Sequence, residues 1–196
     1  MIAGLLLLAA AAAAESQAET QWPEQATAAD AARLERWEEA LEIGRAGVIG
    51  AGEGALLTAR SPLFETGAAL ANSDIPQGLY NCSITKLDGN PDGGLPYIAY
   101  DPFRCRVVDD HGRKHFTKLT GSQRTIGWID KVDKDQSAYL GTLIYHYEDR
   151  LVPYGRTAKR DQAAVVQRIG PNRWRMVFPF PEYESKVDVM ELTPVE

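Results

Sequence analysis

Alternating apolar and polar residues over 79–108 predict two antiparallel strands that pair with each other. If Gly93 and Gly94 form a two-residue hairpin turn, the numbers of facing residues sum to 187. In this register Cys82 faces Cys105. One side of the pair then holds Tyr80, Cys82, Ile84, Phe103, Cys105 and Val107, and the other side holds Asn81, Ser83, Arg104 and Arg106. This division is typical of a sheet that buries one face.

The same register predicts a disulfide between Cys82 and Cys105. Facing residues of an antiparallel pair have Cα atoms about 4.5–5.5 Å apart, which is within disulfide reach. The alternative is a pair of buried free thiols. The alternation weakens towards the turn, and the Asp101-Pro102 dipeptide predicts a bulge there, because proline in sheets is confined to edges and bulges.

Short alternating runs separated by turn residues continue from Gly78 to the C-terminus. Further strands are predicted at 114–119, 124–132, 137–147, 162–169, 174–178 and 187–191. About eight strands at this spacing are typical of a β-sandwich or barrel. Successive hairpins favour an up-and-down meander, and closure into a barrel removes its exposed edges. We therefore expect a mainly β fold with N-terminal α-helices, closed as a lipocalin-like barrel in preference to an open sheet.

Before Gly78, apolar residues recur every three or four positions, which predicts helices. The stripe of the first helix consists of Ala32, Leu34, Trp37, Leu41 and Gly44. Thr27 or Asp30 is the expected N-cap, and Gly44 and Gly47 are expected to end or kink this helix. A shorter helix is predicted at 55–59.

The first 14 residues, MIAGLLLLAAAAAA, form an apolar run followed by small residues. This pattern predicts a secretory signal peptide cleaved after Ala14 or Ala18. A transmembrane helix needs about 20 apolar residues, so we expect no transmembrane anchor; the alternative is an alanine-rich N-terminal helix. Export leads to an oxidising compartment, where two cysteines normally form a bond. The expected localisation is therefore periplasmic or secreted.

The expected organisation has three parts. Residues 1–18 form the signal peptide, residues 19–77 form a helical segment packed on the barrel, and residues 78–196 form the antiparallel β domain. The formal net charge is −6, and no block of five or more like charges occurs. Such blocks mark basic nucleic-acid patches and polybasic membrane anchors, so neither partner is expected.

Known catalytic and metal-binding motifs are missing from the sequence. The three histidines have no H-x-H or H-E-x-x-H spacing, and no serine lies in G-x-S-x-G. Gly50, Gly52 and Ala55 match G-x-G-x-x-A, but a predicted helix precedes them where a dinucleotide site needs a strand. We therefore expect no cofactor, no metal and no catalytic residues.

Two arginine-bearing loops are the best candidates for a binding site. One contains Arg124, and the other contains Arg156 and Arg160. Guanidinium groups hold carboxylate or phosphate through two parallel hydrogen bonds. If both loops lie at one barrel mouth, they can hold an anionic group while Trp128 and Tyr139 line the pocket.

Each of these candidates also has a purely structural interpretation. Arg124 and Arg160 can pair with nearby acids such as Asp130 and Asp161. The two aromatic side chains can simply belong to the hydrophobic core.

Six segments carry a resemblance to a known family: the predicted signal segment, GLYNCSITKL, LPYIAYDPFRCRV, FTKLTGSQRTIG, YLGTL, and PYGRTAKRDQAAVVQRIGPNRWRMVFPFPEYESKVDVMELTP. Together they resemble a family of small exported proteins from Gram-negative bacteria, catalogued only as a domain of unknown function. The resemblance implies a periplasmic or envelope-associated protein without assigned activity. The family's cysteine pair maps onto Cys82 and Cys105.

Three functions are compatible with the sequence. The first is non-enzymatic binding of a small amphipathic or anionic ligand inside the barrel. The alternative is a structural or inhibitory module that binds an envelope protein and has a filled barrel core. A hydrolase is the third, and no residue pattern supports it.

Overall fold

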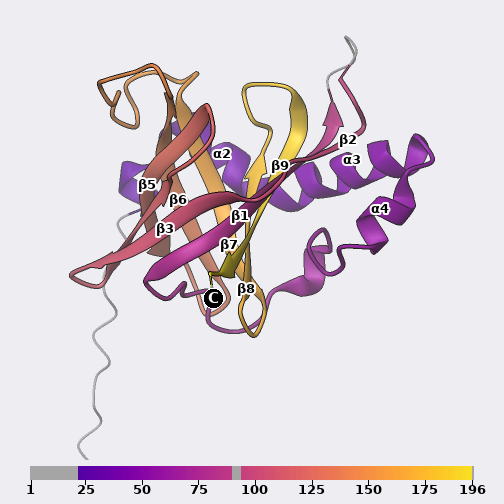
Figure 1. Ribbon diagram of the computed structural model, residues 1–196, viewed down its shortest axis with the longest axis horizontal. Helices are drawn as coiled ribbons and strands as arrows, with labels where there is room; N and C mark the ends of the chain where they lie inside the picture. The colour runs from indigo at the N-terminus through magenta and orange to yellow at the C-terminus, as the bar shows by residue number, and fades with distance from the viewer. Residues whose placement is uncertain (1–21, 90–93, 196) are drawn as a thin grey trace, which may run out of the picture.

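An antiparallel β-barrel with short helices on its outside forms the fold (Figure 1). The computed structural model describes residues 22–89 and 94–195. The predicted signal peptide with its cleavage sites, and Gly93 of the predicted turn, lie outside these residues. No helix among the described residues is long and apolar enough to cross a membrane.

Within residues 22–77, five helical segments precede the barrel. They are α1 (Trp22–Gln25), α2 (Ala28–Glu35), α3 (Trp37–Gly50), α4 (Gly54–Thr58) and the 3-10 helix η1 (Thr66–Ala68). The strands are β1 (Gly78–Gly89), β2 (Tyr97–Ala99), β3 (Phe103–Asp110), β4 (Arg113–Lys118), β5 (Gln123–Lys131), β6 (Gln136–Tyr145), β7 (Asp161–Gly170), β8 (Arg173–Pro179) and β9 (Ser185–Pro194).

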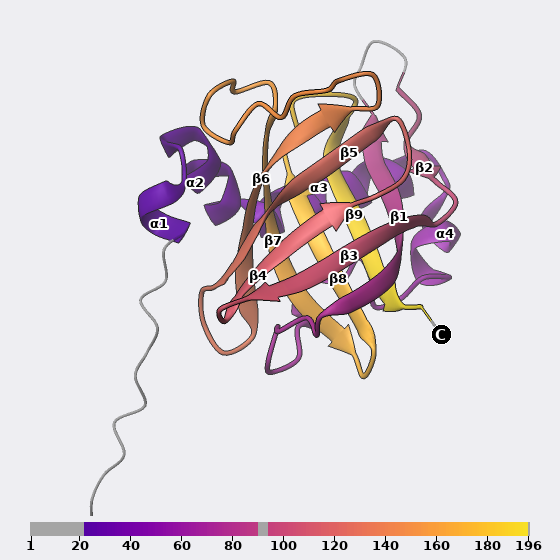
Figure 2. The same ribbon diagram turned by 60° about the vertical axis from the view of Figure 1, so that its left-hand side comes forward.

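The strands form a closed meander. Their order is β2-β1-β3-β4-β5-β6-β7-β8-β9, and an additional pairing of β1 with β9 closes the sheet (Figure 2). The short strand β2 pairs with β1 on the same side as β3. The prediction of a closed antiparallel barrel of eight strands is confirmed, with β2 as an extra strand.

The disulfide between Cys82 and Cys105 is confirmed, but the predicted register is wrong by two residues. Cys105 pairs with Tyr80, and Cys82 pairs with Phe103. The connection is longer than a two-residue turn, because the amide of Gly89 already donates to the carbonyl of Leu95. A shift of two residues keeps every side chain on its face.

The bond therefore joins diagonal neighbours, whose Cα atoms are 6.0 Å apart. Between β2 and β3 the register against β1 changes by one residue, from Thr85–Ala99 to Cys82–Phe103. The change falls at Asp101-Pro102, where the sequence predicts a bulge.

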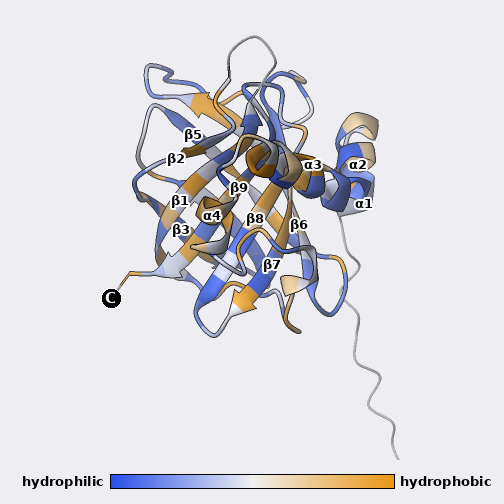
Figure 3. Ribbon diagram, turned by 90° about the vertical axis from the view of Figure 1, so that its right-hand side faces the viewer, coloured by the Kyte–Doolittle hydropathy of each residue, from blue (hydrophilic) through white to orange (hydrophobic). Residues whose placement is uncertain are grey.

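Two apolar layers stabilise the fold. The inner layer fills part of the barrel and includes Tyr80, Phe116, Tyr139, Trp174, Met176 and Leu192. The outer layer lies between the helices and the outer faces of β7, β8, β9 and β1 (Figure 3). Strands that are covered on both faces are almost continuously buried, as β8 is, and lose the simple alternation of a half-buried strand.

The N-terminal helices follow the prediction at their start and depart from it further on. Thr27 is the N-cap of α2, and its hydroxyl oxygen accepts from the amide of Asp30 at 3.2 Å. The expectation that Gly44 and Gly47 end or kink the helix is wrong, because α3 continues to Gly50. A Cβ atom at Gly44 would lie 2.5 Å from Cγ1 of Val187, so this glycine lets α3 approach the barrel closely.

One end of the barrel is closed by residues 70–77. Ile75 is buried in the inner layer. The indole Nε1 of Trp174 donates to the carbonyl of Asp74 at 3.0 Å, and the Tyr80 hydroxyl donates to the carbonyl of Pro76 at 2.6 Å. Access to the interior is therefore limited to the opposite end.

Candidate ligand-binding cavity

A cavity of about 220 Å³ lies at that opposite end of the barrel. Strands β3, β5 and β7 begin here, and β4, β6 and β8 end here. Its apolar lining comes from Ile84, Tyr100, Phe103, Leu143, Phe178 and Met190. Its polar lining comes from Lys86, Lys118, Ser122, Gln123, Arg124, Thr125, Gln162, Glu184 and Asp188. The cavity is therefore amphipathic.

Strand alternation brings charged side chains into this end of the barrel. Residues two apart on a strand share a face. On β4, Phe116 belongs to the inner layer and Lys118 follows it on the same face. On β9, Met190 belongs to the inner layer and Asp188 lies two residues before it. The inward positions thus change from apolar to charged where the barrel meets the cavity.

Lys86 is the cation of the cavity that has acidic partners. Its Nζ lies 2.9 Å from Oδ2 of Asp188 and 3.2 Å from Oε2 of Glu184. Burial opposes the charge of Lys86, but the two carboxylates outweigh that effect and raise its pKa. Burial in turn raises the pKa of Asp188. Both acids of the cavity are therefore engaged with this one lysine.

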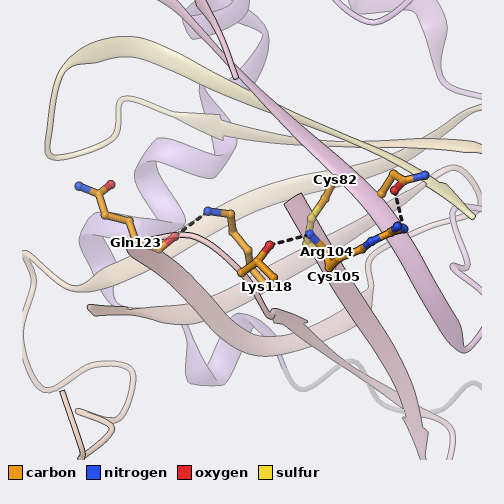
Figure 4. Close-up of a disulfide and its surroundings, with 7 residues drawn as sticks. Cys82, Arg104, Cys105, Lys118 and Gln123 are labelled. Atoms are coloured by element: carbon orange, nitrogen blue, oxygen red, sulfur yellow. Dashed lines mark hydrogen bonds between the residues drawn. A yellow bond between two sulfur atoms is a disulfide. The ribbon is translucent and has the colours of Figure 1, made fainter. Parts of the chain in front are cut away.

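Lys118 is almost completely buried, with 4% of its surface exposed. Its Nζ donates to the carbonyl oxygen of Gln123 at 2.7 Å (Figure 4). The same Nζ lies 3.6 Å from the centre of the Phe103 ring. Within the described residues it forms no ion pair with an acid. Burial, together with the charges of Lys86 and Arg124, lowers the pKa of Lys118 to about 8.

Arg124 has a buried Nε without a hydrogen-bond partner in the part of the chain that the structure describes. The predicted pairing of Arg124 with Asp130 is wrong, because Asp130 is held by Arg113 through two contacts of 2.7 and 2.8 Å. A buried donor that is left unpaired costs about 1–3 kcal/mol.

The two aromatic candidates lie away from the cavity lining. Trp128 is on the outer surface of the barrel, where its ring lies 4.7 Å from that of His115 and the Arg113 guanidinium lies 4.7 Å from its centre. Tyr139 is fully buried in the inner layer. Its hydroxyl hydrogen-bonds that of Thr125 at 2.6 Å, so Tyr139 holds a residue of the cavity lining in place.

The second arginine loop, between β6 and β7, does not add to the cavity lining. Arg156 is exposed. Arg160 binds Glu148 at 2.6 and 2.7 Å, where the sequence suggested Asp161 as its partner. This hydrogen bond lowers the pKa of Glu148 to about 2. The backbone carbonyl of Arg160 accepts from the amide of Leu143, so the loop braces a strand that lines the cavity.

Sequence reasoning found Arg124 and missed Lys86, Lys118 and Asp188. The signal that would have identified them is a charged residue at an inward position of a predicted strand. Lys118 follows Phe116 by two residues, and Asp188 precedes Met190 by two. Such positions are normally apolar in a small barrel whose interior is filled.

Among the described residues, no group of three or more histidine, cysteine, aspartate or glutamate side chains is arranged to hold a metal ion. The cavity instead offers cationic donors beside an apolar wall. This combination suits noncovalent binding of an anion with an apolar part.

Comparison with known proteins identifies a family match and no characterised relative. The model of a family described as "Domain of unknown function (DUF4893)" matches residues 22–192. No curated protein and no solved structure matches the chain.

Proposed function

The chain belongs to the DUF4893 family of unknown function. From the geometry of the cavity at the barrel mouth, we propose that the barrel binds a small amphipathic anion there. Binding is non-enzymatic in this proposal. The anionic group of the ligand contacts Arg124 and Lys118, and its apolar part lies against Phe103, Leu143 and Phe178.

The observation that carries the proposal is an uncompensated pair of cations. The cavity lining includes three cationic residues, and both of its acids are engaged with Lys86. Lys118 and Arg124 have no acidic partner within the described residues, and Nε of Arg124 has no acceptor. Buried cations are normally paired, so a bound anion explains why these two share a cavity.

The cavity also limits the size of the ligand. Ligand sites for drug-sized molecules are about 300–1,000 Å³. A volume of about 220 Å³ fits a carboxylate or phosphate with a short alkyl or small ring substituent. A long lipid chain would have to extend out of the barrel mouth.

The cellular location is part of the proposal. The Cys82–Cys105 disulfide and the apolar run at the start of the sequence support export to an oxidising compartment, the periplasm or the cell exterior. Cell fractionation with N-terminal sequencing of the isolated protein tests this. A cytosolic protein that retains residues 1–18 would contradict it.

Calorimetric titration tests binding with three probes at fixed ionic strength: hexanoate, butyl phosphate and neutral hexanol. We expect saturable binding of at least one of the two anions and much weaker binding of hexanol. Arg124→Gln should weaken anion binding by about 10-fold or more, the effect of losing a charged hydrogen bond of about 1.5–3 kcal/mol. The exposed Arg156→Gln is the matched control and should bind as the wild type does.

The two anionic probes distinguish the class of the anionic group. Preference for hexanoate indicates a carboxylate ligand, and preference for butyl phosphate indicates a phosphate ester. Equal binding of hexanol and hexanoate, or equal binding by Arg124→Gln and the wild type, would contradict the proposal.

The filled inner layer supports a second candidate, a structural or inhibitory module that acts through its outer surface. The Tyr139 ring packs edge to face against Phe116 and against Phe178 within the inner layer. Crosslinking in intact cells tests this alternative. Recovery of one specific envelope protein, combined with no binding of either anion, would favour it over ligand binding.

A further inference from the structure

We propose that Lys118 is a reactive amine that forms an imine with the carbonyl group of a small oxo acid bound in the cavity. This inference rests on the proposed function, since it specifies the chemical class of the anion. The ligand would carry an aldehyde or ketone for Lys118 and a carboxylate for Arg124.

The position of Lys118 supports this role. Lys118 is the last residue of β4 and belongs to the cavity lining. Its Nζ donates to the Gln123 carbonyl (Figure 4) and lies beside the Phe103 ring. Gly121 leaves the space, because a Cβ atom there would lie 3.0 Å from Nζ of Lys118 and 2.8 Å from the Phe103 ring. The amine is thus held at one place in a cavity.

The charges around Lys118 favour its neutral form. Lys86 on β1 and Arg124 on β5 both act to lower its pKa, after the larger effect of burial. The acids that face the same cavity, Glu184 before β9 and Asp188 on β9, are engaged with Lys86. A lysine placed in an apolar pocket beside other cations is a known way of making an amine nucleophilic.

The hydrogen bonding is compatible with a neutral amine. A neutral amine has two N–H groups and one lone pair. One N–H donates to the Gln123 carbonyl oxygen, and the lone pair is then free to attack a carbonyl carbon. Attack forms a C–N bond and a carbinolamine, and loss of one water gives the imine. No oxidant or reductant is needed, and hydrolysis reverses the reaction.

Reductive trapping tests the inference on the intact, oxidised protein. The protein is incubated with glyoxylate, the smallest aldehyde that carries a carboxylate, in the presence of cyanoborohydride. Mass spectrometry of peptides then gives the carboxymethylation rate at each lysine. We expect Lys118 to react on the order of 10-fold or more faster than the exposed Lys159, because lowering the pKa of Lys118 from 10.5 to about 8 leaves far more of its amine neutral.

The pH dependence of the rate and the comparison of variants show whether the modification depends on Lys118 and on the carboxylate of the aldehyde. The rate at Lys118 should level off above about pH 8, where its amine is mostly neutral. Arg124→Gln should slow the reaction of Lys118 with glyoxylate but not with propanal, which lacks the carboxylate. Lys118→Arg should abolish the preferential modification, while Lys159→Arg should leave it unchanged.

The outcomes separate this inference from the proposed function. If hexanoate binds but Lys118 reacts no faster than Lys159, the imine is excluded and anion binding stands. If Lys118 reacts preferentially with both aldehydes and Arg124→Gln has no effect, the reactive amine stands and the oxo acid is excluded as its ligand.

Discussion

Cys82 on β1 and Cys105 on the neighbouring strand β3 are joined by a disulfide, although neither is the other's direct partner in the sheet. Cys82 pairs with Phe103, and Cys105 pairs with Tyr80. Both cysteines are fully buried in the inner layer. Phe103 lines the cavity. The disulfide therefore lies in the inner layer, next to a residue of the cavity lining.

Removal of the disulfide should destabilise the protein substantially. The bond spans 23 positions of sequence and removes conformational freedom from the unfolded chain. We expect Cys82→Ser combined with Cys105→Ser to lower the free energy of unfolding by about 2–5 kcal/mol. Chemical denaturation of the oxidised protein and the double variant measures this. A change below about 0.5 kcal/mol, the usual range of neutral surface substitutions, would contradict the structural role.

Substitution of Gly44 should separate close packing from helix propensity. Alanine is favoured over glycine in a helix by about 1 kcal/mol. At Gly44, however, the added Cβ would lie 2.5 Å from Val187 and 2.9 Å from Leu87. We expect Gly44→Ala to destabilise the protein by about 1–3 kcal/mol, the typical cost of overpacking.

Gly50 offers the matched control at the end of the same helix. Nothing lies within 4 Å of a Cβ atom built there. Gly50→Ala should therefore be neutral or stabilising by up to about 1 kcal/mol. Equal thermal stabilities of the two variants would show that α3 does not pack as closely on β1 and β9 as described.

Replacement of Lys118 by methionine should stabilise the protein in a pH-dependent way. The pKa of Lys118 is lowered from 10.5 to about 8 in the folded protein, so the unfolded chain binds more protons between these values. The stability that this lysine contributes therefore rises with pH across that interval. Below about pH 8 its burial costs on the order of 3 kcal/mol, at about 1.4 kcal/mol per pKa unit.

Denaturation curves at pH 7 and at about pH 10.5 provide the measurement. Lys118→Met should be more stable than the wild type at pH 7, and the difference should shrink towards high pH. Lys159→Met, at an exposed position, should show no such trend. A stability difference for Lys118→Met that is independent of pH would contradict the lowered pKa.

Asp188→Asn should strengthen anion binding while it weakens the fold. The substitution removes one of the two carboxylates at Lys86 and makes the cavity more positive. It also leaves a largely buried lysine with only the more exposed Glu184, at a cost of about 1–3 kcal/mol. Hexanoate affinity should rise by about three-fold or more at low salt, and the gain should fall as salt screens the charge. A lower affinity in the folded variant would contradict this electrostatic account of the cavity.

The pattern of the sequence predicted the barrel and the faces of its strands but not the register. Alternation specifies which residues share a face, and a shift of two residues preserves that. The choice between registers depended on the loop after Gly89, where Asn90, Pro91, Asp92, Gly93 and Gly94 all suit turns. The disulfide could therefore be predicted although its direct partners could not.

The binding site was only partly predictable for a related reason. Ile126 and Trp128 alternate as regularly as Thr125, Gly127 and Ile129, so the sequence does not say which set faces inward. The structure places Thr125, Gly127 and Ile129 on the inside, since Ile129 belongs to the inner layer. Trp128 is therefore outside, where it packs with Arg113. Arg124 was recognised because it follows the turn residues Thr120, Gly121 and Ser122, although the structure places it in β5, whereas Lys118 lay inside a predicted strand.

Nuclear magnetic resonance of the arginine side chains tests the central claim most directly. The Nε–H signal of Arg124 is followed while hexanoate or butyl phosphate is added at constant ionic strength. The account predicts a saturable shift of this signal, larger than that of the exposed Arg156, with a dissociation constant equal to the calorimetric value. An Arg124 signal that stays unchanged at saturating concentrations of both anions would contradict the account.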